Sequence, residues 1–143
     1  MMIFFEENNI TIFNDAKLTE TKSSIKIDLS NVKNTDLKSI SNREALFSQY
    51  INGIESYALF MISGVADEKL AFHSTSKAYL KEAQRAFVLL ALANVDNEDV
   101  DNVKHLYFMW NEKQTAKKLK FKKDEISREL SECEERSIQS ICT

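Results

Sequence analysis

The chain has 143 residues but no proline and only two glycines. These two residue types most often end helices and form turns, because proline lacks the backbone donor and glycine adopts positive φ. Their scarcity favours long helices joined by turns of asparagine, aspartate and serine. A content of 43% hydrophobic and 29% charged residues is typical of a globular protein. At this length we expect a single domain over residues 1–143.

A long apolar stretch, residues 45–66, carries one charge, that of Glu55. At 100° per residue its large apolar side chains fall on one broad arc, and Asn52, Glu55 and the serines fall on a narrower, opposite one. In a lipid-facing span Glu55 would cost about 2–3 kcal/mol. The stretch therefore predicts a core helix of a soluble protein, without a membrane partner. Solvent exposure is the favoured interpretation of Asn52 and Glu55, and contact with a neighbouring element is the alternative.

Residues 1–30 predict a β-rich start. Two β-rich runs flank Asn8–Asn9, a pair that suits a hairpin turn because asparagine tolerates positive φ. In residues 24–30 apolar and charged side chains alternate, as in a half-buried strand. Residues 14–24 are polar, and we expect a loop with a short third strand there. The predicted fold class is α+β: a short N-terminal antiparallel β-hairpin or meander on a bundle of about four helices, with a long C-terminal helix.

The helical part runs from about residue 43 to residue 140. The first helix, 43–65, begins after Ser41 or Asn42 as its N-cap, and Gly64 lies where a C-terminal signal belongs. Asp67 is placed to cap the helix that follows.

The second helical segment covers residues 67–94. Its small polar run Ser74–Ser76 leaves open a division into a short helix and a long one. Asp96 or Asn97 is placed to cap the third segment, which begins near Val100. The periodicity predicts that apolar residues of all three segments meet in one core cluster. The expected members are Phe47, Ile51, Ile54, Ala58, Ile62, Phe87, Leu90, Tyr107 and Trp110.

Beyond Trp110 the helical pattern changes. A thin apolar stripe within an arc of about 60° continues on another side of the helix. Its members are Leu119, Ile126, Leu130 and Cys133. Lysines surround the helix almost completely, at positions Lys113, Lys117, Lys118, Lys120, Lys122 and Lys123. A charged helix with one apolar seam is expected to project and to offer that seam to one partner, either another helix of this chain or a second protein.

Familiar catalytic and metal-binding patterns are missing from the sequence. The acidic turn that starts at Asp96 lacks the glycine that an EF-hand loop requires. His73 and His105 lie 32 residues apart without a ligand pattern around them. Cys133 lies in an acidic stretch, which disfavours the thiolate that a nucleophile needs. Two glycines are too few for a phosphate-cradling loop. We therefore expect no enzyme activity, no cofactor and no metal site.

Two segments carry a family resemblance. An N-x-x-E helix (Asn52, Glu55) runs into a G-x-x-D-E turn that starts at Gly64, and a later L-Y-x-x-W segment carries Tyr107 and Trp110. Over about residues 43–115 the chain resembles an uncharacterised family of bacterial and phage helical domains. Many members carry a membrane helix before this domain, where the present chain has a β-rich start. The resemblance implies a phage or mobile-element setting, and it transfers no functional residue.

Two functional hypotheses follow. The first is a non-catalytic, cytoplasmic protein-interaction module (an inhibitor, adaptor or accessory factor) that binds another protein or itself, for example as a dimer, through the seam residues Leu119, Ile126 and Leu130. The alternative is a nucleic-acid-associated accessory protein that uses the basic segment 113–123. Its expected contacts are Lys117, Lys118, Lys120 and Lys122. A groove binder concentrates its charge on one face, whereas these lysines ring the helix, so the first hypothesis is favoured.

Overall fold

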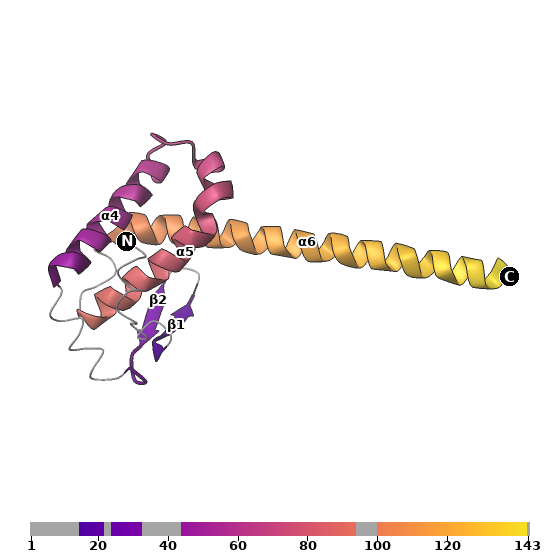
Figure 1. Ribbon diagram of the computed structural model, residues 1–143, viewed down its shortest axis with the longest axis horizontal. Coiled ribbons are helices and arrows are strands. Elements are labelled where there is room, and N and C mark those ends of the chain that lie inside the picture. The colour runs from indigo at the N-terminus through magenta and orange to yellow at the C-terminus, as the bar shows by residue number, and fades with distance from the viewer. Residues whose placement is uncertain (1–14, 22–23, 33–43, 94–99, 143) are drawn as a thin grey trace. The chain divides into compact units, whose positions relative to one another are not determined.

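The computed structural model describes residues 15–21, 24–32, 44–93 and 100–142. These residues form two strands and three helices, in the order β1, β2, α4, α5 and α6 (Figure 1). The mostly helical fold with a small antiparallel hairpin confirms the predicted α+β character. The expected hairpin around Asn8–Asn9 and the expected N-caps of the first and third helices lie outside the described residues.

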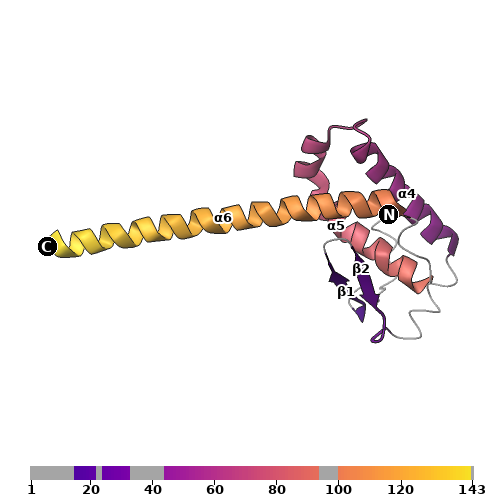
Figure 2. The same cartoon turned by 180° about the vertical axis from the view of Figure 1, so that it is seen from behind.

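The hairpin pairs β1 (Lys17–Glu20) with β2 (Ile25–Asp28) in antiparallel register, with Glu20 opposite Ile25. The alternation expected for β2 is confirmed: Ile25 is buried, while Lys26 and Asp28 are exposed. β1 confirms the short strand expected within residues 14–24. Figures 1 and 2 show the hairpin beside α5, and β2 contacts this helix.

Helix α4 (Glu44–Ile62) ends three residues before the predicted bound of 65, and Gly64 follows it where the sequence predicts a C-terminal signal. Gly64 has φ 78°, a left-handed conformation that glycine adopts without the strain that a Cβ atom brings. Beyond this turn Asp67 caps α5 (Glu68–Leu92): its Oδ1 accepts a hydrogen bond from the backbone N–H of Leu70 at 3.1 Å. The roles predicted for Gly64 after the end of α4 and for Asp67 as the N-cap of α5 are therefore confirmed.

Helix α5 continues through Ser74–Ser76, so the division that the sequence left open does not occur, and the described part of the chain holds three helices where about four were expected. The hydroxyl of Thr75 donates to the carbonyl of Ala71 at 2.7 Å, and that of Ser74 donates to the carbonyl of Leu70 at 3.2 Å. Hydroxyls bonded back in this way keep the helix intact but bend it. Figure 1 shows such a change of direction in the N-terminal half of α5.

The core lies among α4, α5, β2 and the first turns of α6 (Asp101–Cys142). Six of the nine residues predicted to cluster belong to it, and the other three, Phe47, Ile51 and Ile62, are partly buried and pack against it. Tyr107 and Trp110 of α6 are wholly buried and are the two largest of the fully buried side chains. The two residues of this segment that the sequence predicts for the core, Tyr107 and Trp110, thus lie on the core-facing side of α6.

Internal packing divides the chain into two compact units, Met1–Trp110 and Asn111–Thr143. The boundary coincides with the change of pattern after Trp110, and α6 belongs to both units. The single domain expected over residues 1–143 stays a prediction beside this division. None of the helices in the described ranges combines the length and the apolarity needed to cross a membrane.

Candidate functional site

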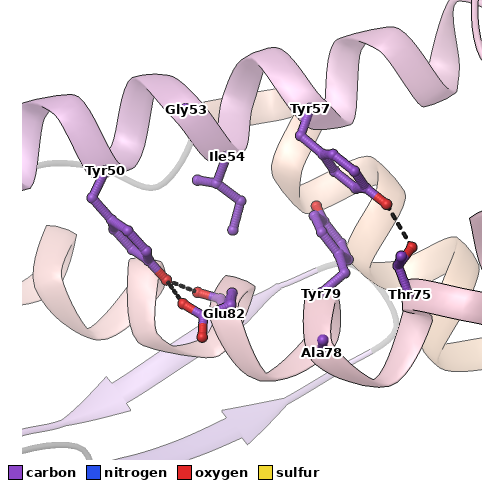
Figure 3. Close-up of a pocket in the computed structure, with 8 residues that line it drawn as sticks. All are labelled: Tyr50, Gly53, Ile54, Tyr57, Thr75, Ala78, Tyr79 and Glu82. Atoms are coloured by element: carbon purple, nitrogen blue, oxygen red, sulfur yellow. Dashed lines mark hydrogen bonds between the residues drawn. The ribbon is translucent and has the colours of Figure 1, made fainter. Parts of the chain in front are cut away.

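A cavity of about 230 Å³ lies between α4 and α5. Its walls are almost entirely apolar, with three tyrosine rings among them. Figure 3 shows Tyr50 and Tyr57 pointing from α4 toward α5, and Tyr79 rising from α5 between them. The lining residues are Tyr50, Gly53, Ile54, Tyr57, Thr75, Ala78, Tyr79 and Glu82.

The polar groups at this cavity bind one another. The hydroxyl of Tyr50 donates to Oε2 of Glu82 at 2.6 Å and lies 2.7 Å from the carbonyl oxygen of the same residue. The other carboxylate oxygen of Glu82 pairs with Arg85 at 2.9 Å. The hydroxyls of Tyr57 and Thr75 share a hydrogen bond of 2.6 Å. Burial, and after it the bond to Glu82, raises the pKa of Tyr50 far above its usual value.

Aromatic packing explains why the cavity is walled by tyrosine. Tyr79 stacks on Tyr57 with ring centroids 5.5 Å apart, and it meets Trp110 edge-on at 5.2 Å. The buried Tyr79 hydroxyl donates to the carbonyl of Val103 at 2.8 Å, and burial raises the pKa of this tyrosine, with the charge of Glu55 as the next cause. The indole N–H of Trp110 donates to Oε1 of Glu68 at 2.6 Å. The Tyr79 hydroxyl and the Trp110 indole N–H thus both have hydrogen-bond partners, and the cluster anchors α6 in the core.

Glu55 corrects the favoured interpretation of the sequence. It is half-buried, and its carboxylate accepts hydrogen bonds from the backbone N–H of Val103 at 3.1 Å and from Nδ2 of Asn102 at 2.7 Å. The backbone N–H of Asn102 is a further donor at 3.4 Å. These donors belong to the first turn of α6, so α4 caps this helix through a carboxylate placed at its positive end. Asn52 is exposed, as expected.

Tyr107 joins the hairpin to the helices. Its hydroxyl donates to Oε1 of Glu20 in β1 and accepts a hydrogen bond from Nε2 of Gln84 in α5 at 3.0 Å. Burial, followed by the bond to Glu20, raises the pKa of Tyr107. This network holds the hairpin in place and leaves the hydroxyl with both a donor and an acceptor as partners.

The residues predicted to make interactions lie in the second unit. Every described side chain from Thr115 to Ile138 is exposed. The seam members Leu119, Ile126 and Leu130 expose 61%, 57% and 59% of their surface, and Cys133 is an exposed free thiol. All four follow the periodicity of α6 and so share one face of the helix. The four lysines Lys117, Lys118, Lys120 and Lys122 are also exposed and lie around the helix rather than on one side.

Both histidines are exposed residues of helices. His73 on α5 and His105 on α6 are both exposed, and within the described ranges no three His, Cys, Asp or Glu side chains gather around a point where a metal ion would fit.

Comparisons with family models, with curated proteins and with solved structures found no match to this chain. The resemblance over residues 43–115 stays a prediction.

Sequence reasoning missed the cavity and the cap. The spacing within residues 45–66 correctly predicts that the large apolar side chains share one face of α4, but periodicity does not reveal that three tyrosine rings leave a gap between two helices. The signal for the cap was a lone carboxylate in an otherwise apolar helix. A buried acid of that kind needs hydrogen-bond donors, and the start of a later helix supplies them.

Proposed function

We propose that this chain is a non-catalytic protein-interaction module that acts through residues 113–136 of α6, with Leu119, Ile126 and Leu130 as its contact seam. The observation that carries the proposal is the exposure of these three large apolar side chains on one face of a helix whose described side chains are all exposed from Thr115 to Ile138. Single exposed apolar residues are ordinary on protein surfaces, whereas a row along one face is typical of a helix that binds another helix.

The first unit supports the non-catalytic part of the proposal. In its cavity the oxygens of Glu82 bind Tyr50 and Arg85, and the hydroxyls of Tyr57 and Thr75 bind each other. A general acid, a base or a nucleophile needs a polar atom directed at the substrate. The polar groups here are instead used to hold α4 against α5, which is the role of a scaffold.

The basic segment motivates a second candidate, an accessory protein that binds nucleic acid. Six lysines between positions 113 and 123, with no acidic residue among them, give a high local charge. Their ring-like distribution and the acidic residues that follow weaken this candidate. A salt titration of binding to duplex and single strands tests it. Affinity that falls steeply with salt and is lost when Lys117, Lys118, Lys120 and Lys122 become Glu would favour nucleic acid as the partner.

Site-specific photo-crosslinking in the native host tests the interaction proposal. A photoreactive amino acid in place of Leu130 lies on the seam, and the same group in place of Arg128 lies on the opposite side of the helix and serves as the matched control. We expect a protein adduct from position 130 and not from position 128. Equal adducts from both positions, or none from position 130, would contradict the proposal. The phage or mobile-element setting is tested separately by the neighbouring genes.

A further inference from the structure

The seam of α6 has the spacing of a coiled coil. Leu119, Ile126 and Cys133 are seven residues apart, and Leu130 lies four residues after Ile126, as in the two core positions of a heptad. With Leu119 as position d of a heptad, the d positions are Leu119, Ile126 and Cys133, and the a positions are Ala116, Lys123 and Leu130. The described side chains of this whole row are exposed, so the row lacks the apolar cover that such a pattern requires.

Basic and acidic residues occupy different halves of the same segment of α6. Residues 113–123 carry six lysines and no acidic residue, whereas residues 124–135 carry six acidic residues and one arginine, Arg128. The side chains of both halves are exposed. A helix with one basic and one acidic half complements a second copy of itself when the two run in opposite directions, because each basic half then lies along an acidic half.

From this complementarity we infer that the partner of the seam is a second copy of this chain, paired antiparallel through residues 113–136. The inference rests on the proposed function and deepens it. In antiparallel pairs position a of one helix faces position d of the other. One register places Leu119 against the partner copy's Leu130, Ile126 against Lys123, and Ala116 against Cys133, each twice by symmetry.

Charge selects this register and direction. At the flanking g positions Lys122 faces Glu129 of the second copy, again twice. Sliding the helices by one heptad in one direction places Glu129 opposite Glu129 of the second copy. Sliding them in the other direction places Lys122 opposite Lys122 of the second copy. A parallel pair sets Lys123 against Lys123 in the core and Glu129 against Glu134 beside it. Of these four arrangements, the register proposed is the one that avoids like charges at these positions.

Disulfide trapping tests the direction directly. In the antiparallel pair Cys133 lies against position 116 of the second copy, and about 25 Å from the second Cys133, because 17 residues of helix separate positions 116 and 133. A disulfide requires Cα atoms within about 7 Å. In full-length chain carrying Cys142→Ser, which leaves Cys133 as its thiol, Ala116→Cys should therefore give a linked dimer on mild oxidation. The same spacing forbids a link within one chain.

Two single-thiol chains complete the test. Cys142→Ser alone, and Ala116→Cys with Cys133→Ser and Cys142→Ser, should each stay unlinked, while a mixture of the two should link. Linking of Cys142→Ser alone would mean a parallel pair and would overturn the inference. A chain that forms no link and sediments as a monomer at every concentration would overturn it too. In that case a photo-crosslink from position 130 to a different protein would leave the proposed function standing.

A charge exchange gives an independent measurement. Glu129→Lys sets lysine against Lys122 of the antiparallel copy and should weaken dimerisation roughly tenfold, and adding Lys122→Glu should restore it. In a parallel pair Glu129→Lys would meet Glu134 and strengthen the dimer, so the sign of the change distinguishes the two directions. Glu135→Lys makes the same charge change away from the seam, and its effect should be clearly smaller. Equal weakening by both substitutions would overturn the assigned register.

Discussion

The carboxylate of Glu55 is the half-buried group on which the start of α6 most directly depends. We expect Glu55→Gln to destabilise the first unit, because one carboxylate oxygen becomes an NH₂ group that faces the N–H donors of α6. The carboxylate accepts from Val103 N at 3.1 Å and from Asn102 Nδ2 at 2.7 Å. The amide can satisfy one of these donors and must leave the other without an acceptor.

The magnitude follows from these contacts. A hydrogen bond to a charged group contributes about 1.5–3 kcal/mol to stability. A negative charge at a helix N-terminus contributes a further amount of about 0.3–1 kcal/mol. Since the amide retains one bond, we expect a loss of about 2 kcal/mol in the free energy of unfolding. Trp110 is the only tryptophan and is wholly buried in this unit, so its fluorescence during denaturant unfolding measures the change.

The control is Glu112→Gln, the same substitution at an exposed position of α6, which should change the free energy of unfolding by less than about 0.5 kcal/mol. A double-mutant cycle with Asn102→Ala should show that the two residues are coupled. If Glu55→Gln unfolds at the same denaturant concentration as the wild type, the carboxylate does not cap α6, and the explanation of this buried charge is wrong.

Three further predictions concern the first unit. Ile54→Ala, at a side chain that is 4% exposed and lines the cavity, should cost about 2–3 kcal/mol in denaturant unfolding, and an unchanged midpoint would contradict the core assignment. Gly64→Ala should cost about 1 kcal/mol through its φ of 78° alone, because no atom lies within 4 Å of the added Cβ; equal stability would show that this turn is unstrained. Burial raises the pKa of Tyr50, Tyr79 and Tyr107, so the stability they confer is complete below about pH 10 and is lost as the pH rises further, when the unfolded chain ionises first. Their tyrosinate absorbance should therefore appear together with unfolding, and ionisation of all three in the folded protein would refute this.

The spacing of apolar residues, together with the residues that end or cap helices, was sufficient to predict the helices. The apolar spacing of α4 and of the start of α6 identified the core side of both helices, because each buries one continuous stripe. Gly64 and Asp67 marked the turn between α4 and α5 for local reasons, a positive φ and a side-chain cap. Such features depend on residues that are neighbours in the chain, and sequence patterns report them directly.

Features that depend on distant residues could not be predicted in this way. The fate of Ser74–Ser76 was left open because hydroxyls either compete with the helix or bond back to it, and the packing of α5 decides between the two. The bond from Asn102 to Glu55 joins residues 47 positions apart. The seam was found because its signal is again local: a narrow apolar stripe in a charged helix.

The central claim is that the first unit carries the folding of this chain, while the seam on α6 carries its association. Sedimentation equilibrium and denaturant unfolding of Ile126→Asp with Leu130→Asp, compared with the wild type, test both halves together. The wild type should dimerise with rising concentration and the variant should stay monomeric. At concentrations where both are monomers, Trp110 fluorescence should report the same unfolding midpoint, since association no longer adds to stability. A variant that dimerises like the wild type, or whose first unit unfolds more easily as a monomer, would contradict the claim.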